Sequence, residues 1–288
     1  MIWRMASPAL AGVAMTGFAL TGFALIGVAL FAATAYQTEI AQWRVQRVEG
    51  LKRDGGWLSV AGLFWLHEGA NTFGKGPGNE IGLPDGAAQA GVFELHDGKV
   101  TVKMEGATRE LWPDSLDVAK VGRLSLLVIK RSDKYGIRLK DPDSQYRREF
   151  RGIETYPARE EYRVTAKWVA APEKISILNV IGQTESMDSP GYAVFSLHGH
   201  EYRLRPVLET AGAKELFYIF RDQTSAKETY GAGRFLYSAM PAAGRVVLDF
   251  NKAYNPPCAF TPYATCPLPP PENRLAVRIE AGEKKYGH

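Results

Sequence analysis

The residues best suited to chemistry lie at the ends of apolar runs in the C-terminal third of the chain. Arg221 and Asp222 follow one apolar run, and Arg234 begins the next. Asp249 and Asn251 follow a third. Charged groups beside buried strands must pair with one another or face a cleft, because an unpaired buried charge is costly.

Two interpretations of these residues stay open. In the first they form a structural network, in which arginine and aspartate pair and clamp the segment that follows. In the second they line a polar cleft, in which arginines receive an anion and the other groups position it. The candidate ligand-binding residues are Arg221, Asp222, Lys227, Tyr230, Arg234, Asp249, Asn251 and Tyr254.

The histidines supply no recognisable catalytic or metal motif. His198 and His200 could share one strand face and offer two metal nitrogens, but no third ligand is assignable by spacing. A Cys–His or Ser–His pair would need a partner far away in the sequence. We therefore predict no metal site and no cofactor, and whether the protein is an enzyme stays open.

The chain has two cysteines, Cys258 and Cys266, both inside residues 249–273. Outside the cytoplasm, two cysteines in one stiff segment favour a disulfide. Closing so short a loop would stabilise the fold by about 2–3 kcal/mol. Free structural thiols are the first alternative, and a metal-binding or nucleophilic pair is the second.

Residues 249–273, called here the proline-rich segment, must hold these groups in place. Seven of the chain's 17 prolines lie between Pro256 and Pro271, so the segment cannot form a helix or a central strand. Its aromatic residues, Phe260 and Tyr263 among them, make it too apolar for a flexible linker. We expect an ordered functional loop pinned onto a β core.

From residue 57 onward, short apolar runs alternate with turn residues, a pattern typical of an all-β fold. Residues 92–104 and residues 192–205 each predict a hairpin. Strands are also expected over residues 162–169, 175–181, 215–220 and 275–279, the first two separated by a turn at Ala170-Ala-Pro. The prediction is two packed β units of sandwich or barrel architecture, residues 57–167 and residues 168–288, the second carrying the proline-rich segment.

The first 38 residues predict export from the cytoplasm. Residues 5–38 carry no charge and exceed the ~20 residues that cross a bilayer as a helix. Residues 1–35 are interpreted as a membrane anchor or as a signal peptide cleaved near Ala35. A helix buried in the fold would need apolar partners on every side. The single cation that precedes the apolar run, Arg4, favours a cell-envelope protein facing the periplasm or exterior, or a secreted one.

A short amphipathic helix is expected next, over residues 36–56, with Ile40, Trp43 and Leu51 near one face. The net charge of +4 is too weak for a nucleic-acid partner, so the expected partners are the membrane, through the N-terminal segment, and a small polar or anionic ligand.

Three stretches of the chain resemble the motifs of a known family. They are residues 249–273 together with Ala281-Gly-Glu-Lys, residues 220–236 and residues 56–66. They are similar to the signatures of the domain-of-unknown-function 1684 family, and the resemblance covers residues 40–286. It implies a bacterial or archaeal protein with no established activity, and it carries over no catalytic residues.

The sequence therefore predicts an extracytoplasmic β-rich protein that binds a small molecule or a partner through a polar cleft at strand ends. The alternative is a hydrolase-type enzyme acting on a small polar or anionic substrate in the same cleft. If the candidate side chains line an open pocket, they favour a binding or catalytic site. If they satisfy one another's hydrogen bonds and charges, they favour a structural network.

Overall fold

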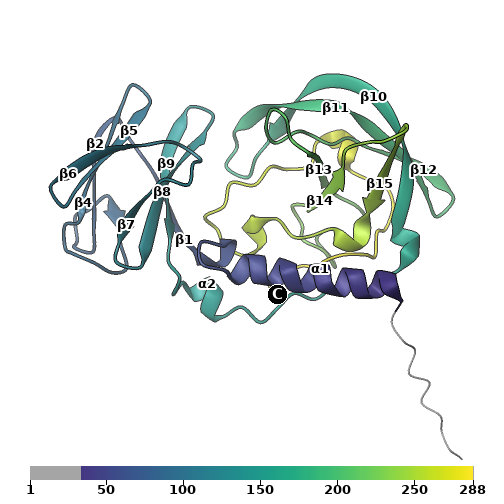
Figure 1. The fold of residues 1–288 in the computed structure, drawn as a ribbon, viewed down its shortest axis with the longest axis horizontal. Helices are drawn as coiled ribbons and strands as arrows, with labels where there is room; N and C mark the ends of the chain where they lie inside the picture. Colours follow the sequence, from purple (N-terminus) through teal and green to yellow (C-terminus); the bar gives the residue numbers. More distant parts are fainter. Residues whose placement is uncertain (1–33, 288) are drawn as a thin grey trace, which may run out of the picture. The chain divides into compact units, whose positions relative to one another are not determined.

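The computed structural model describes residues 34–287, so the segment interpreted as a signal peptide or anchor lies outside the described residues. Among residues 34–287, no helix is both long and apolar enough to cross a membrane. The described chain is rich in β-strands, as expected, and is arranged in several sheets with few helices (Figure 1).

The expected helix is present as α1 (Ala35–Lys52) and begins with a capping box. The hydroxyl of Thr34 accepts from the Gln37 backbone nitrogen at 3.1 Å, and the Gln37 side chain accepts from the Thr34 nitrogen at 3.0 Å. Ile40 and Leu51 are buried. These reciprocal bonds satisfy two donors that a helix start would otherwise leave unpaired.

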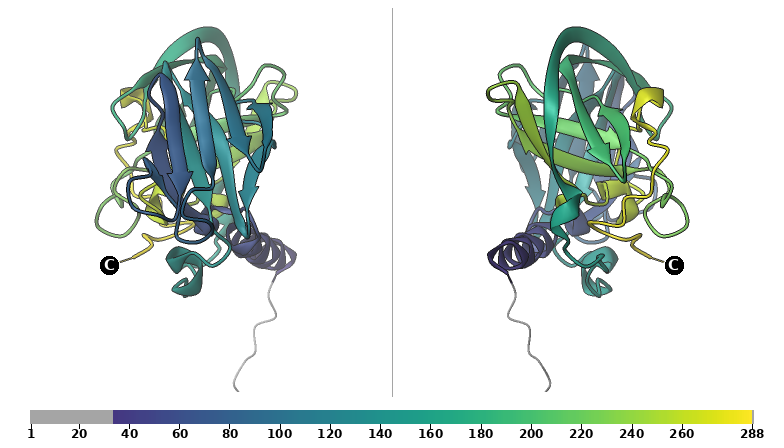
Figure 2. Two further views of the ribbon diagram at one scale, coloured as in Figure 1. Left: turned by 90° about the vertical axis from the view of Figure 1, so that its left-hand side faces the viewer. Right: turned by 90° about the vertical axis from the view of Figure 1, so that its right-hand side faces the viewer.

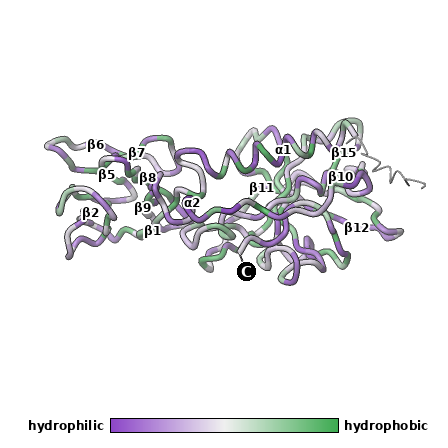
Figure 3. Tube along the Cα trace, turned by 90° about the horizontal axis from the view of Figure 1, so that it is seen from below, coloured by the Kyte–Doolittle hydropathy of each residue, from purple (hydrophilic) through white to green (hydrophobic). Residues whose placement is uncertain are grey.

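The inward face of α1 is also basic, which the helical pattern did not predict. Arg44 donates to the backbone oxygen of Tyr156 at 2.8 Å, and Arg47 forms an ion pair with Glu283 at 3.0 Å. Hydrophobic and hydrophilic residues are therefore interspersed along the helix (Figure 3). The helix docks through charge pairs as well as through apolar contact.

The first β unit contains two sheets whose side chains share one core, which includes Phe73, Phe93 and Leu126. One sheet has the order β1-β9-β8-β7 and the other β3-β2-β4-β5-β6. The strands are β1 (Val60–Trp65), β2 (Gly69–Gly74), β3 (Ile81–Gly82), β4 (Gly91–His96), β5 (Lys99–Met104), β6 (Ala107–Leu111), β7 (Val118–Val121), β8 (Leu124–Arg131) and β9 (Lys134–Lys140). The hairpin predicted over residues 92–104 is confirmed as β4–β5.

The second β unit pairs a four-stranded sheet, β12-β11-β10-β15, with the two-stranded sheet β13-β14. Its strands are β10 (Arg163–Leu178), β11 (Thr184–Leu197), β12 (His200–Leu204), β13 (Glu215–Phe220), β14 (Arg234–Ala239) and β15 (Arg245–Asp249). The long strands β10 and β11 arch over β13 and β14 (Figures 1 and 2). The hairpin predicted over residues 192–205 is confirmed as β11–β12.

Two strand predictions for this unit were wrong. Residues 163–178 form one strand instead of two, because a register shift between Ala170 and Glu173 accommodates Pro172, which has no N–H for the ladder. Residues 275–279 are not a strand, although Ile279 is buried. The unit boundary placed between residues 167 and 168 falls inside β10.

Alternation along β14 directs its side chains to two different environments. Leu236 faces the main core of the second unit, and Phe235 and Tyr237 face a second cluster with Phe217 and Ile219 of β13. Residues 215–220 form the expected strand, and the side chains from Leu216 to Phe220 are buried on both of its faces. This second, aromatic face of β13 and β14 matters for the site.

The proline-rich segment is ordered, as its composition predicts, and it contacts both β units. Thr261 donates to the Val60 oxygen at 3.1 Å, and Arg131 of β8 donates to the Thr265 hydroxyl at 2.9 Å. On the other side, Leu268 donates to the backbone oxygen of Leu178 in β10 at 2.7 Å. The segment thus forms a wall between the strands of both units.

Candidate functional site

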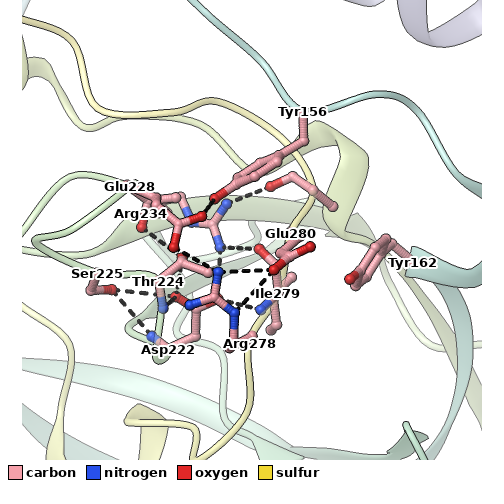
Figure 4. A network of polar contacts seen from close by, with 12 residues as sticks. Tyr156, Tyr162, Asp222, Thr224, Ser225, Glu228, Arg234, Arg278, Ile279 and Glu280 are labelled. Atoms are coloured by element: carbon pink, nitrogen blue, oxygen red, sulfur yellow. Dashed lines mark hydrogen bonds and ion pairs between the residues drawn. The ribbon is translucent and has the colours of Figure 1, made fainter.

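Asp222 and Arg234, two of the predicted site residues, lie together in a buried network (Figure 4). Arg234 Nη2 contacts Asp222 Oδ2 at 2.9 Å and also donates to the Ile279 oxygen at 3.0 Å, and Nη1 donates to the Ala281 oxygen. Asp222 accepts further hydrogen bonds from Thr224 and from the Ile279 nitrogen. Burial lowers the pKa of Arg234 and the charge of Asp222 opposes this.

Asp249 and Asn251 belong to a second network, at the start of α1. Asp249 Oδ1 accepts from the Tyr36 hydroxyl at 2.7 Å, and Asn251 Nδ2 donates to that hydroxyl oxygen at 2.7 Å. Asn251 Oδ1 accepts from the Arg159 nitrogen at 3.0 Å. Burial and the bond to Asp249 raise the pKa of Tyr36. Both groups are therefore engaged in fixing the helix to the sheet.

The remaining predicted residues are dispersed. Lys227 is exposed, Arg221 is half-buried beside the chain at Arg274, and Tyr230 donates to the Cys258 oxygen at 3.2 Å. The structure therefore divides the eight candidates among several places, and their strand-end groups hold one another or the backbone. Tyr254 alone of the eight lines the cavity described below.

Cys258 and Cys266 are both free thiols in the described structure, so the predicted disulfide is not formed. Each sulfur instead accepts the other residue's backbone N–H, Cys266 Sγ at 3.2 Å and Cys258 Sγ at 3.3 Å. The Cys266 thiol and the charge of Arg138 lower the pKa of Cys258, although its burial opposes them. Burial raises the pKa of Cys266. Among residues 34–287, no group of three or more His, Cys, Asp and Glu side chains is placed to hold a metal ion.

A cavity of about 680 Å³ lies between the proline-rich segment and strands of both β units. Its walls are mainly apolar and aromatic, and Phe217, Phe235 and Tyr237 enter it from the second face of β13 and β14. Tyr237 and Tyr254 are stacked, with ring centroids 6.2 Å apart. The other apolar or sulfur-bearing wall residues are Trp57, Ile177, Met187, Pro257, Cys266 and Pro267.

Four of the five charged residues that line this cavity have side-chain partners among the described residues, and the fifth is Glu185. Arg47 lies over the Tyr254 ring at 4.5 Å, Arg131 pairs with Asp114 at 3.0 Å, and Glu209 accepts from Tyr237 at 2.6 Å. Asp114 and Glu209 are exposed. Water therefore screens these two carboxylates, whereas Glu185 is half-buried.

Arg138 of β9 is buried one layer behind this wall. Its guanidinium lies over the Trp57 ring at 5.0 Å and is 6% exposed, so the cavity-lining tryptophan covers it. Within the described residues, neither Nε nor Nη2 has a hydrogen-bond partner. Burial, with the like charge of Arg131 adding to it, lowers the pKa of Arg138 to about 10.

Asn179 supplies a second buried donor at the same cavity. Its Oδ1 accepts from the nitrogens of Ile181 and Gln183 at 3.1 and 3.0 Å, which fixes the orientation of the amide. Its Nδ2 has no hydrogen-bond partner in residues 34–287. Asn179 lines the cavity and pairs as an isolated bridge with Pro267.

Sequence reasoning missed Arg138, Asn179 and Trp57. One signal for Arg138 was available: it is a charged residue between Ile137 and Leu139 in an apolar run, and its strand is buried. Nothing in the sequence pairs that run with the proline-rich segment, more than a hundred residues away.

Comparison with known proteins identifies the class. The family described as "Protein of unknown function (DUF1684)" matches residues 148–284, so the chain belongs to that family. The match includes the motifs at residues 220–236 and 249–284, whereas the motif at residues 56–66 precedes it.

A solved relative is also similar. It is the solution NMR structure of an uncharacterized protein from Haloarcula marismortui, which is 31% identical to this chain. The alignment covers 48% of this chain and 78% of the other, with a TM-score of 0.41. Comparison with the curated proteins gives no match.

Proposed function

We propose that this protein binds a small molecule with an apolar, ring-bearing body in the cavity of about 680 Å³. The observation that carries the proposal is the aromatic wall formed by Tyr254 with Phe217, Phe235 and Tyr237, which leads into a space of the size that small-molecule sites have. The proposed binding site thus lies beside the proline-rich segment, and the paired groups of Asp222 and Arg234 hold the chain at residues 279–281 instead.

The composition of the wall supports a binding role. Stacked rings offer flat apolar surface that is already ordered, so a planar ligand buries area there without ordering the side chains first. Arg47 keeps Tyr254 in place by lying over its ring, since Arg47 is itself held by Glu283 and by the Asn255 oxygen at 2.9 Å. Such a preformed pocket favours binding.

Hydrolysis in the same cavity receives less support. A thiol nucleophile needs a depressed pKa, but burial raises the pKa of Cys266, the cysteine that lines the cavity. We therefore propose binding as the function of this cavity.

The test uses the neutral fluorescent probe N-phenyl-1-naphthylamine, whose emission rises in an apolar site. We expect saturable binding with one probe per chain. Met187→Trp, which fills the cavity, should weaken binding about ten-fold or more, a loss of about 1.4 kcal/mol. Met240→Trp makes the same exchange at an exposed position outside the cavity and should leave binding unchanged. Equal binding by the two variants would contradict the proposal.

We infer further that the protein acts outside the cytoplasm and is held at the membrane by its N-terminal segment. The charge-free residues 5–38 motivate this inference. The capping box supports an anchor over cleavage near Ala35, because cleavage there would remove Thr34 from the start of α1. Fractionation of cells that express the full chain should leave it in salt-washed membranes. Recovery of a protein that begins near Tyr36 would show cleavage instead, and recovery from the cytosol would contradict both.

A further inference from the structure

Arg138 presents a vacant hydrogen-bonding edge that other arginines in this protein use to hold carboxylates. The Nε and Nη2 groups of an arginine lie on one side of the guanidinium and match two oxygens of an anion. Arg123 uses this pair on Asp141, with Nε–Oδ1 at 2.8 Å and Nη2–Oδ2 at 3.1 Å. In Arg138 the same two nitrogens are buried and, within residues 34–287, have no hydrogen-bond partner.

Such an arrangement disfavours the fold unless something else occupies that edge. A buried donor without an acceptor loses its bonds to water and gains nothing in return, and a charge makes the loss larger. The nearby charge of Arg131 adds repulsion, and Asp114 is already engaged by Arg131 through two contacts of 3.0 and 3.1 Å. An apolar side chain would fill this position at lower cost.

The vacant edge belongs to the surroundings of the proposed cavity. Trp57 lies against the guanidinium and lines the cavity, and Cys266, whose sulfur is close enough to interact with the Arg138 charge, lines it too. Asn179 borders the same wall at Pro267 and offers a second donor, Nδ2, which has no partner in the part of the chain that the structure describes. Asn179 therefore lines the cavity directly, Arg138 lies behind its Trp57 wall, and the stacked tyrosines form another part of the lining.

We propose that the ligand of this cavity is an anion whose carboxylate, sulfonate or phosphate oxygens are received by Arg138 and Asn179, while its apolar rings contact Tyr237 and Tyr254. The proposal rests on the proposed function and names the ligand class for the same cavity. Trp57 covers the guanidinium, so its ring must turn aside as the anion enters. Two oxygens on Nε and Nη2 then replace the missing acceptors, as Asp141 does on Arg123.

The test compares two probes that differ by one anionic group. 1-Anilinonaphthalene-8-sulfonate has the ring system of N-phenyl-1-naphthylamine with a sulfonate added. The parent protein should bind the sulfonate about ten-fold or more tightly than the neutral probe, since a charged hydrogen-bonded contact contributes at least that much. Arg138→Met should remove this preference and leave the affinity for the neutral probe unchanged. Arg138→Lys, which keeps the charge without the paired edge, should retain part of it.

Arg123→Met is the matched control, because it removes an arginine whose edge is already occupied by Asp141 and should leave the preference intact. Near-ultraviolet circular dichroism of each variant shows whether its fold is kept. If both probes bind the parent protein equally, or if Arg138→Met weakens the binding of both probes alike, the anion proposal is wrong, but the cavity remains a binding site. If neither probe binds, the proposed binding function itself is wrong.

Discussion

Two buried arginines of this protein, Arg234 and Arg138, differ in their hydrogen-bond and ion-pair partners. Arg234 is 1% exposed, pairs with Asp222 at 2.9 Å and donates to the oxygens of Ile279 and Ala281. Arg138 is 6% exposed and, in the described part of the chain, has two nitrogens without a partner.

The hydrogen-bond partners of each arginine show what it does for the fold. The partners of Arg234 come from β13's end and from residues 279–281, so its charge ties the C-terminal chain to the second β unit. Arg138 lies over Trp57, but within residues 34–287 its Nε and Nη2 bond to nothing, and this cost to folding is expected to be recovered when a ligand supplies the acceptors. Arg234 therefore stabilises the folded state, and Arg138 is expected to be stabilised when a ligand binds.

The largest effect is expected from breaking the Arg234 pair. Arg234→Met leaves the carboxylate of Asp222 buried without its cation, and the free energy of unfolding should fall by about 3–5 kcal/mol. Urea denaturation measures it. Arg148→Met, which breaks the exposed contact with Asp143, is the control and should lose far less. A loss of comparable size in both variants would show that burial does not increase the contribution of the Arg234–Asp222 pair to the free energy of unfolding.

A smaller effect of opposite sign is expected at Arg138. The pKa of about 10 corresponds to a folding penalty of about 3 kcal/mol, of which the contact with Trp57 returns up to about 2 kcal/mol. Arg138→Met should therefore raise the free energy of unfolding of the ligand-free protein by about 1 kcal/mol. A marked fall would mean that Arg138 is structural, like Arg234.

The gain at Arg138 should depend on pH in a defined direction. Below about pH 10 the guanidinium is charged in the folded and unfolded chains alike, so the advantage of Arg138→Met stays constant. Above pH 10 the folded chain releases this proton while the unfolded chain keeps it, so the parent protein gains stability and the difference shrinks. Urea denaturation of both proteins at pH 8 and above pH 10 measures this.

The smallest effect is a change in thiol reactivity. Because the pKa of Cys258 is lowered and that of Cys266 is raised, iodoacetamide should modify Cys258 first, and both thiols should react in denaturant without reduction. Arg138→Met removes a nearby positive charge and should slow the first reaction a few-fold. Peptide mass spectrometry follows the two sites separately. Faster labelling of Cys266 would contradict the expected order of reaction. An unchanged rate in the variant would show that Arg138 does not affect the reactivity of the thiols.

The sequence predicted the β-rich class, the helix that precedes it and both hairpins, because alternation and turn residues are local signals. It also predicted that the proline-rich segment is ordered. It failed at Pro172, where a bulge lets one strand continue, and at residues 275–279. There the backbone makes isolated bonds to the backbone at Arg221 and Gln223 and to the side chains of Asp222 and Arg234, and no continuous ladder forms. Both failures arose where partners from elsewhere in the fold decided the local structure.

For the candidate site, too, the sequence predicted some features and missed others. Residue types at strand ends indicated that Asp222 and Arg234 must pair or face a cleft, and the structure shows them paired. The cavity combines α1, β8, β10, β13, β14 and the proline-rich segment, and no local pattern indicates such a combination.

The residue pattern is enough to predict which segments are extended, which segment is too proline-rich to join a sheet, and that buried charges must be compensated. It does not specify which charges are compensated, because that depends on how the segments pack. Distances between residues far apart in the chain set the partners of each arginine, and those distances exist only once the two β units and the proline-rich segment have packed.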